Sequence, residues 1–349
     1  MTFTRIDINA ENDNSVFNSD NENRTSTQIT YSESNLKNDG IYRLTCTVKD
    51  MAGNTTTTSE IVNSKGDKAG EDEILFSVNR LGSTFSIKDD VKEIVDKGYI
   101  QEVTDDIVIT EINPDTVDKY AVSLKVGNAQ PRALNQGDNY TRTPNDNKAD
   151  KWKTYTYSIN KENFSEEAAY SLAITTTDKA DNTSYSETKN PDYSKEPAAK
   201  ISFVVDRTIP QVVVNNLEEG GHYNVETQTV DIIANDDNLL QNVSIILNGE
   251  TVREYTEEEL VENGGRMTLD IASSESLQNL KIEAKDAAAN STEDTEETAI
   301  YFESFLVTTN LFIQFINNPI LVISSIAGTL LIAGGIIFLV MRKKKKAIK

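Results

Sequence analysis

The sequence predicts an all-β fold of tandem β-sandwiches, followed by one C-terminal transmembrane α-helix. Three observations predict it. Apolar and polar residues alternate in many short runs, one strand-and-turn pattern occurs three times, and a 22-residue uncharged apolar segment runs from Ile320 to Met341. Alternation with a period of two is typical of strands with one buried face. A long apolar run near the end of the chain is typical of a membrane span.

The repeated pattern is a five-residue string, Asp-x-Ala-x-Asn, that follows an alternating run. A polar interval and a second apolar run come after each copy. Asp and Asn favour tight turns because their side chains bond nearby backbone groups. We therefore predict that each string is a hairpin connection, repeated because the domain is repeated. The turn residues are Asp50, Asn54, Asp178, Asn182, Asp286 and Asn290.

Two segments carry a family resemblance. Asn38 to Asn54 resembles the penultimate strand and hairpin of bacterial immunoglobulin-like (Ig-like) repeat domains of Gram-positive cell-surface proteins, and Val205 to Pro210 resembles the junction between two such repeats. The resemblance covers the chain up to about Ser304 and implies Ig-like sandwiches. Such repeats serve as spacers and as binding modules, so the resemblance is specific for fold and not for function. It also implies a tyrosine corner at Asp39, Gly40 and Tyr42.

The spacing of the repeat predicts the domain organisation. Only 49 residues precede Asp50, whereas 80 positions separate Asp206 from Asp286. About thirty residues, enough for the first two strands of a sandwich, are thus expected to be missing from the first domain, and we expect the chain to be the C-terminal part of a longer protein. The predicted segments are a truncated Ig-like domain at 1–78, an Ig-like domain with an inserted short helix at 79–205, an Ig-like domain at 206–304, a juxtamembrane segment at 305–319, a transmembrane helix at 320–341 and a basic cytoplasmic tail at 342–349.

The middle domain contains further local signals. Val91, Ile94 and Val95 fall at helical spacing, and Gly98 supplies a stop. The run from Ile107 to Ile112 alternates as a strand. Trp152 is interpreted as a core residue, the alternative being a platform on which a sugar stacks.

The C-terminal segment predicts a single-pass membrane anchor. A helix of 22 residues is about 33 Å long, close to the roughly 30 Å of a bilayer core. The positive-inside rule places the basic tail in the cytoplasm and the sandwiches outside. Small residues on one face, Gly328 and Gly335 among them, leave helix pairing open as an alternative. Phe305, Phe312 and Phe315 suit the interfacial zone. The anchor residues are Ile320, Gly328, Gly335, Met341, Arg342 and Lys343.

The net charge of the chain limits the classes of molecule that it can bind. The part before Arg342 holds 28 basic and 56 acidic residues, a net charge of −28, which excludes a nucleic-acid binder. Membrane lipid is an expected partner, and a host or neighbouring-cell protein or glycan is a second. The lone Cys46 lacks a disulfide partner within the chain, and a single histidine, His222, makes nucleophilic catalysis and a His-rich metal site unexpected. We therefore expect no enzyme activity and no cofactor.

Calcium is the chemical alternative to plain turns, because it takes six to eight oxygen ligands, often from clustered Asp and Asn. The candidate ligands are Asp178, Asp181, Asn182, Asp236, Asp237 and Asn238.

The expected function is that of a membrane-anchored bacterial surface protein whose sandwiches form an acidic extracellular stalk for an upstream adhesive or binding region. One alternative is that the sandwiches themselves bind a host protein or glycan. Another is that the chain is the non-catalytic C-terminal portion of a large cell-surface carbohydrate-active enzyme.

Overall fold

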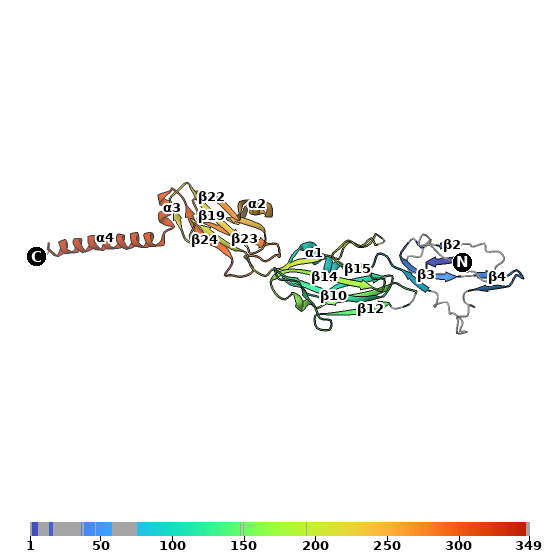
Figure 1. Ribbon diagram of the computed structural model, residues 1–349. Coiled ribbons are helices and arrows are strands. Elements are labelled where there is room, and N and C mark those ends of the chain that lie inside the picture. Colours follow the sequence, from blue (N-terminus) through green and yellow to red (C-terminus); the bar gives the residue numbers. More distant parts are fainter. Residues whose placement is uncertain are drawn as a thin grey trace. The chain divides into compact units, whose positions relative to one another are not determined.

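The computed structural model describes residues 2–5, 14–16, 36, 38–45, 47–57, 75–146, 148, 150–192 and 194–346. The chain divides into two compact units, Met1–Asp206 and Arg207–Lys349. Both are built on β-sheets, and a long helix ends the second unit (Figure 1). The division lies one residue from the predicted boundary at 205/206. The domain boundary predicted at 78/79 falls inside the first unit and stays a prediction.

The main sandwich of the first unit, built from strands β7 to β16, has two sheets. One has the strand order β12-β13-β9-β7, and the other has the order β11-β10-β14-β16-β8, with β15 paired to the end of β14. Every pairing is antiparallel except that of β8 with β16. The strands are β7 (Thr84–Ile87), β8 (Tyr99–Ile100), β9 (Ile107–Asn113), β10 (Val117–Val126), β11 (Arg132–Ala133), β12 (Tyr140–Asp146), β13 (Lys153–Ile159), β14 (Ala168–Asp178), β15 (Thr183–Tyr185) and β16 (Ile201–Val205).

This order is that of an Ig-like sandwich. Such a sandwich pairs strands A-B-E-D in one sheet and places C, F and G in the other. Taken in the order in which they lie across the sheet, β7, β9, β13 and β12 occupy the A, B, E and D positions, while β10, β14 and β16 occupy C, F and G. The fold class predicted from the sequence is therefore confirmed: the chain is an Ig-like domain protein.

Alternating burial forms the core of this sandwich. The side chains of β9 are buried and half-buried in strict alternation, and those of Ile107 and Ile109 are fully buried. Helix α1 (Asp89–Lys97) closes one side through Val91, which is 2% exposed, and ends at Gly98, whose φ is 74°. Trp152 is buried, at 5% exposed, as interpreted from the sequence. A 3₁₀ turn, η4 (Lys161–Phe164), precedes β14.

The second unit contains a similar sandwich. Its sheets have the orders β17-β19-β22 and β18-β24-β23-β20-β21, with β18 parallel to β24. Helix α2 (Glu257–Asn263) begins with a capping box between Thr256 and Glu259. The strands are β17 (Gln211–Asn215), β18 (His222–Tyr223), β19 (Thr227–Asn235), β20 (Leu240–Leu247), β21 (Glu250–Thr256), β22 (Arg266–Ala272), β23 (Gln278–Asp286) and β24 (Ile300–Val307).

The N-terminal strands form a smaller set. A four-stranded sheet has the order β2-β1-β3-β6, and β4 pairs with β5. The tyrosine corner implied by the resemblance is present, since the Tyr42 hydroxyl donates to the Asn38 carbonyl oxygen at 2.7 Å. Tyr170 makes the same bond to Glu166 at 2.8 Å. Cys46 lies outside the described residues. The strands are β1 (Thr2–Arg5), β2 (Asn14–Val16), β3 (Gly40–Thr45), β4 (Thr47–Lys49), β5 (Thr55–Thr57) and β6 (Leu75–Val78).

Two expectations differ from the structure. In the first two repeats the hairpin does not join the alternating run to the second apolar run: it joins the alternating run to a short strand, β5 or β15, and the second apolar run follows later as β6 or β16. The interfacial assignment of Phe305 is also wrong: this side chain is fully buried in the core of the second sandwich, because β24 continues to Val307.

A buried ion pair lies inside the sandwich of the first unit. The Arg142 guanidinium is 3.8 Å from Glu111 Oε2 and stacks over the rings of Tyr155, at 3.7 Å, and Tyr120, at 4.1 Å. Tyr120 belongs to the opposite sheet, so this cation joins both layers. Glu111 also accepts hydrogen bonds from Ser83 Oγ and Tyr157 Oη, at 2.6 and 2.7 Å. Burial, with Glu111 beside it, raises the pKa of Tyr157.

We predict that Arg142→Met destabilises this sandwich by about 3 kcal/mol, because it leaves the Glu111 carboxylate buried without its cation. The measurement is urea unfolding followed by the fluorescence of Trp152, the only tryptophan of the chain. The additional change Glu111→Gln should restore part of the loss. Arg132→Met, at an exposed position of β11, is the control and should stay within about 0.5 kcal/mol of wild type. Equal unfolding midpoints for Arg142→Met and wild type would contradict the assigned role.

Candidate functional site

The three repeated strings form hairpin turns with one geometry. In each, the Asp amide donates to the Asn carbonyl oxygen, at 2.9, 3.1 and 3.1 Å, and the fourth residue donates back to the Asp carbonyl oxygen, at 3.0, 3.1 and 3.2 Å. That fourth residue has positive φ whether it is Gly53 (89°), Asp181 (63°) or Ala289 (70°). This is a three-residue hairpin loop, a type I turn closed by a left-handed residue.

The Asp side chain explains why each string begins with that residue. Its Oδ1 accepts a hydrogen bond from the Asn backbone amide in all three copies, at 2.8, 3.0 and 2.8 Å. In the first copy the Asn54 side chain also donates to Asp50, which lowers the pKa of that carboxyl group. The Asp thus closes its own loop.

In the second copy the Asp also joins distant segments. The Asp178 carboxylate, 3% exposed, accepts from the Nδ2 atoms of Asn79 at 2.7 Å, Asn113 at 3.1 Å and Asn182 at 3.2 Å. It also accepts from the backbone amide of Ala180 at 2.9 Å. These residues precede β7, end β9 and follow β14, so one carboxylate holds three parts of the fold together. We name Asp178, Asn79, Asn113 and Asn182 the amide cluster.

The amide cluster bears on the calcium alternative. Calcium requires oxygen ligands, whereas Asp178 is surrounded by N–H donors. The structure brings Asp178 and Asn182 into contact and leaves Asp181 exposed. This geometry favours a hydrogen-bonded network at these three candidates, and calcium binding there stays a prediction to be tested.

The other calcium candidates lie at the end of β19 in the second unit. Asp236 Oδ1 accepts from the Asn238 backbone amide at 2.8 Å, and Asp237 and Asn238 are exposed. Asp236 and Asp286 place carboxylate oxygens within 4.8 Å of each other. These positions correspond to Asn113 and Asp178 in the first unit, so an amide–carboxylate pair there becomes two carboxylates here. Sequence reasoning missed this pairing, because only the strand order brings the ends of β19 and β23 together.

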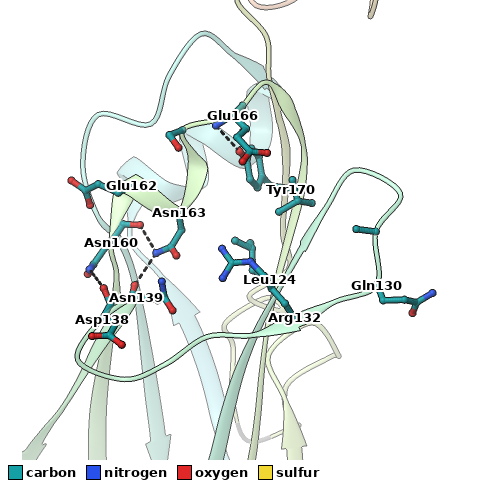
Figure 2. A pocket seen from close by; sticks show the side chains of 13 residues that line it. Leu124, Gln130, Arg132, Asp138, Asn139, Asn160, Glu162, Asn163, Glu166 and Tyr170 are labelled. Carbon is teal, nitrogen blue, oxygen red and sulfur yellow. Dashed lines mark hydrogen bonds between the residues drawn. The ribbon is translucent and has the colours of Figure 1, made fainter.

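A polar hollow of about 400 Å³ lies at one end of the first unit's sandwich (Figure 2). Its asparagine side chains hold the surrounding loops: Asn163 Nδ2 donates to the carbonyl oxygens of Asn139 and Asn160, each at 2.8 Å, and Asn160 Nδ2 donates to that of Asp138 at 2.8 Å. Charged side chains, Arg132 among them, line its exposed part. Its one aromatic residue, Tyr170, is buried, so the hollow has no exposed ring for stacking a sugar.

The C-terminal helix α4 (Pro319–Lys346) is the candidate membrane anchor. Its segment Pro319–Met341 has a mean hydropathy of 2.4 and is unburied, so it is long and apolar enough to cross a membrane. Asn318 caps its start by accepting from the amides of Ile320 and Leu321, each at 3.2 Å. A side chain added at Gly328 or Gly335 would contact nothing within 4 Å, and helix pairing through these glycines stays a prediction.

No family model matches, and no curated protein matches. Solved structures with some similarity include fibronectin(III)-like modules of Clostridium thermocellum CbhA (14% identity, 65% of this chain and 96% of that chain, TM-score 0.28). A marsupial T cell receptor (9%, 65% and 73%, TM-score 0.33) and an amphioxus IgVJ-C2 molecule (12%, 66% and 98%, TM-score 0.26) are others. Because these TM-scores are low, the Ig-like assignment rests on the strand pairing described above.

We predict that Asp178→Ala destabilises the first unit's sandwich by about 3 kcal/mol, because several amide donors from three segments lose the acceptor that they share. Trp152 fluorescence during thermal melting gives the measurement. The wild-type midpoint should be the same in millimolar calcium and in chelator. Asp181→Gly is the matched control from the same hairpin: it removes a candidate calcium ligand but suits the left-handed position, so we expect stability equal to wild type or slightly higher.

The opposite result would establish an ion site. An ion that binds only the folded state at a hundredfold excess over its Kd stabilises that state by about 2.7 kcal/mol. A midpoint that rises by several degrees with calcium, and loses that rise in both Asp178→Ala and Asp181→Gly, would replace the hydrogen-bonded network with a ligand set.

Proposed function

We propose that this chain is a membrane-anchored bacterial surface protein of the Ig-like repeat kind, whose sandwiches form an acidic extracellular stalk that holds an adhesive or binding region away from the membrane. The observation that carries the proposal is the order of elements at the C-terminus. An Ig-like sandwich ends at Val307, an apolar helix long enough to cross a bilayer begins at Pro319, and Arg342 to Lys346 follow it.

The charge distribution supports this orientation. Basic residues next to a span favour the cytoplasmic side, and acidic residues have little influence on insertion. The six basic residues after Met341 have no acidic neighbour, whereas the part before Arg342 carries a net charge of −28. Like charges on successive sandwiches repel each other and keep a crowded surface protein soluble. A stalk of this kind requires neither a catalytic site nor a cofactor, and we propose none.

A second candidate function is that the sandwiches themselves bind a ligand. The polar hollow of the first unit supports it, because Arg132, Asp138 and Glu162 lie exposed around a concave surface. Hydrogen-bonding groups without an exposed aromatic ring suit a polar glycan or a loop of a partner protein. A change in affinity for cells or glycans on Arg132→Ala, with unchanged melting, would favour this function over the stalk.

We predict that protease added to intact cells digests the sandwiches and leaves an epitope placed after Lys349 protected. Replacing Arg342 and Lys343 to Lys346 with neutral residues should expose that epitope in a fraction of the molecules, because the charge bias that orients the span is lost. The measurement is immunodetection of the tail before and after permeabilisation. Replacing Lys148, Lys151 and Lys153, which are far from the span in sequence, is the control and should leave the orientation unchanged. A tail accessible on intact wild-type cells would overturn the proposal.

A further inference from the structure

The short helix α3 (Leu311–Ile316) turns its apolar face outward. Leu311, Phe312, Phe315 and Ile316 are 70%, 68%, 38% and 48% exposed. Residues spaced in this way share one face of a helix. Gln314, the one polar side chain of this helix, lies on the other face and is half-buried. The usual arrangement of a surface helix on a soluble domain, with apolar residues inward, is therefore reversed.

Hydrogen bonds hold α3 in this orientation. Gln314 Nε2 donates to the Thr308 carbonyl oxygen at 2.7 Å, and the Thr308 amide donates to Tyr223 of β18 at 3.0 Å. Asn310 caps the start of the helix by accepting from the amides of Phe312 and Ile313, at 3.1 and 3.4 Å. The face that carries Gln314 is thus attached to the end of the sandwich, and the face formed by Leu311, Phe312, Phe315 and Ile316 cannot turn inward without breaking these bonds.

The neighbouring helix α4 indicates what covers the exposed face. Three residue steps separate Ile316 from Pro319, a distance of at most about 10 Å in an extended chain. Each headgroup region of a bilayer is roughly 5–8 Å thick, so α3 must lie at or near the interface if α4 spans the hydrocarbon core. No charged residue occurs between Glu303 and Arg342. Phenylalanine and leucine on one face are typical of a helix that lies in the interface plane.

We propose that Leu311, Phe312, Phe315 and Ile316 form a membrane-docking face that inserts at the boundary between lipid headgroups and acyl chains. The adjoining sandwich is then docked on the bilayer instead of hanging from a flexible linker. The inference rests on the proposed membrane span of α4. Because the face is apolar and the sandwiches are acidic, docking requires no anionic lipid and is insensitive to salt.

The test uses the full chain in phosphatidylcholine vesicles and tryptophan quenching by lipids brominated at different depths. The variants are Phe312→Trp in α3, Leu330→Trp in α4 and Val261→Trp in α2. Val261 is 67% exposed, and Figure 1 shows α2 at the other end of the same sandwich from α3. The Trp152 signal of the wild type is subtracted. Phe315→Trp is a second reporter in α3 should Phe312→Trp fail to fold, and thermal melting checks each variant.

We expect shallow bromines to quench Phe312→Trp at least threefold more than deep ones, deep bromines to quench Leu330→Trp most, and neither to quench Val261→Trp. Raising salt to 0.5 M should not change this pattern. If Leu330→Trp escapes quenching, the proposed function itself fails. If Leu330→Trp is quenched and both α3 reporters are not, only the docking face is overturned. If Phe312→Trp is protected from quenching and this protection disappears as the protein is diluted in lipid, the face is covered by a second copy of the chain. That result would overturn the proposal too.

Discussion

The buried carboxylate at the end of strand β14 is the interaction on which one end of the first unit's sandwich depends. A carboxylate inside a protein must be surrounded by hydrogen-bond donors, because burying the charge without them is very unfavourable. Asp178 obtains these donors from residues before β7, at the end of β9 and in its own hairpin. Satisfying one side chain therefore fixes where three segments meet. The same end of the sandwich holds Ser83, whose amide and hydroxyl contact Ser184 and Glu111.

The second unit has different residues at the corresponding end of its sandwich. Asp236 stands where the first unit has Asn113, so two carboxylates face each other near the third hairpin. Like charges at this separation raise the free energy of the folded state unless a neighbouring positive group compensates. The hairpin nevertheless keeps the same hydrogen bonds, at nearly the same distances, as the exposed first copy. The turn is thus independent of its surroundings, while the network behind it changes from repeat to repeat.

The C-terminal end of the second unit shows a third constraint. Soluble sandwiches hide large apolar side chains, and β24 does so with Phe305, Leu306 and Val307. A few residues later the rule is inverted in α3, where a glutamine faces the protein and two phenylalanines face outward. An exposed apolar face of this kind is most stable in an apolar medium, which is the environment that the docking proposal gives it. A stalk whose last sandwich is seated on the bilayer in this way would leave its bending to the joints between sandwiches.

The sequence by itself determined the sandwich class, the three hairpins, helix α1 with its stop at Gly98, and the apolar helix. These features are local: alternation, turn chemistry and long apolar runs each act within a few residues. Only the tertiary structure decided that Phe305 belongs to the core, that Arg142 pairs with Glu111 and reaches Tyr120 of the opposite sheet, and that Asp236 lies beside Asp286. These contacts depend on which strands become neighbours. Strand order is set by packing across the whole domain, and no short window of sequence records it.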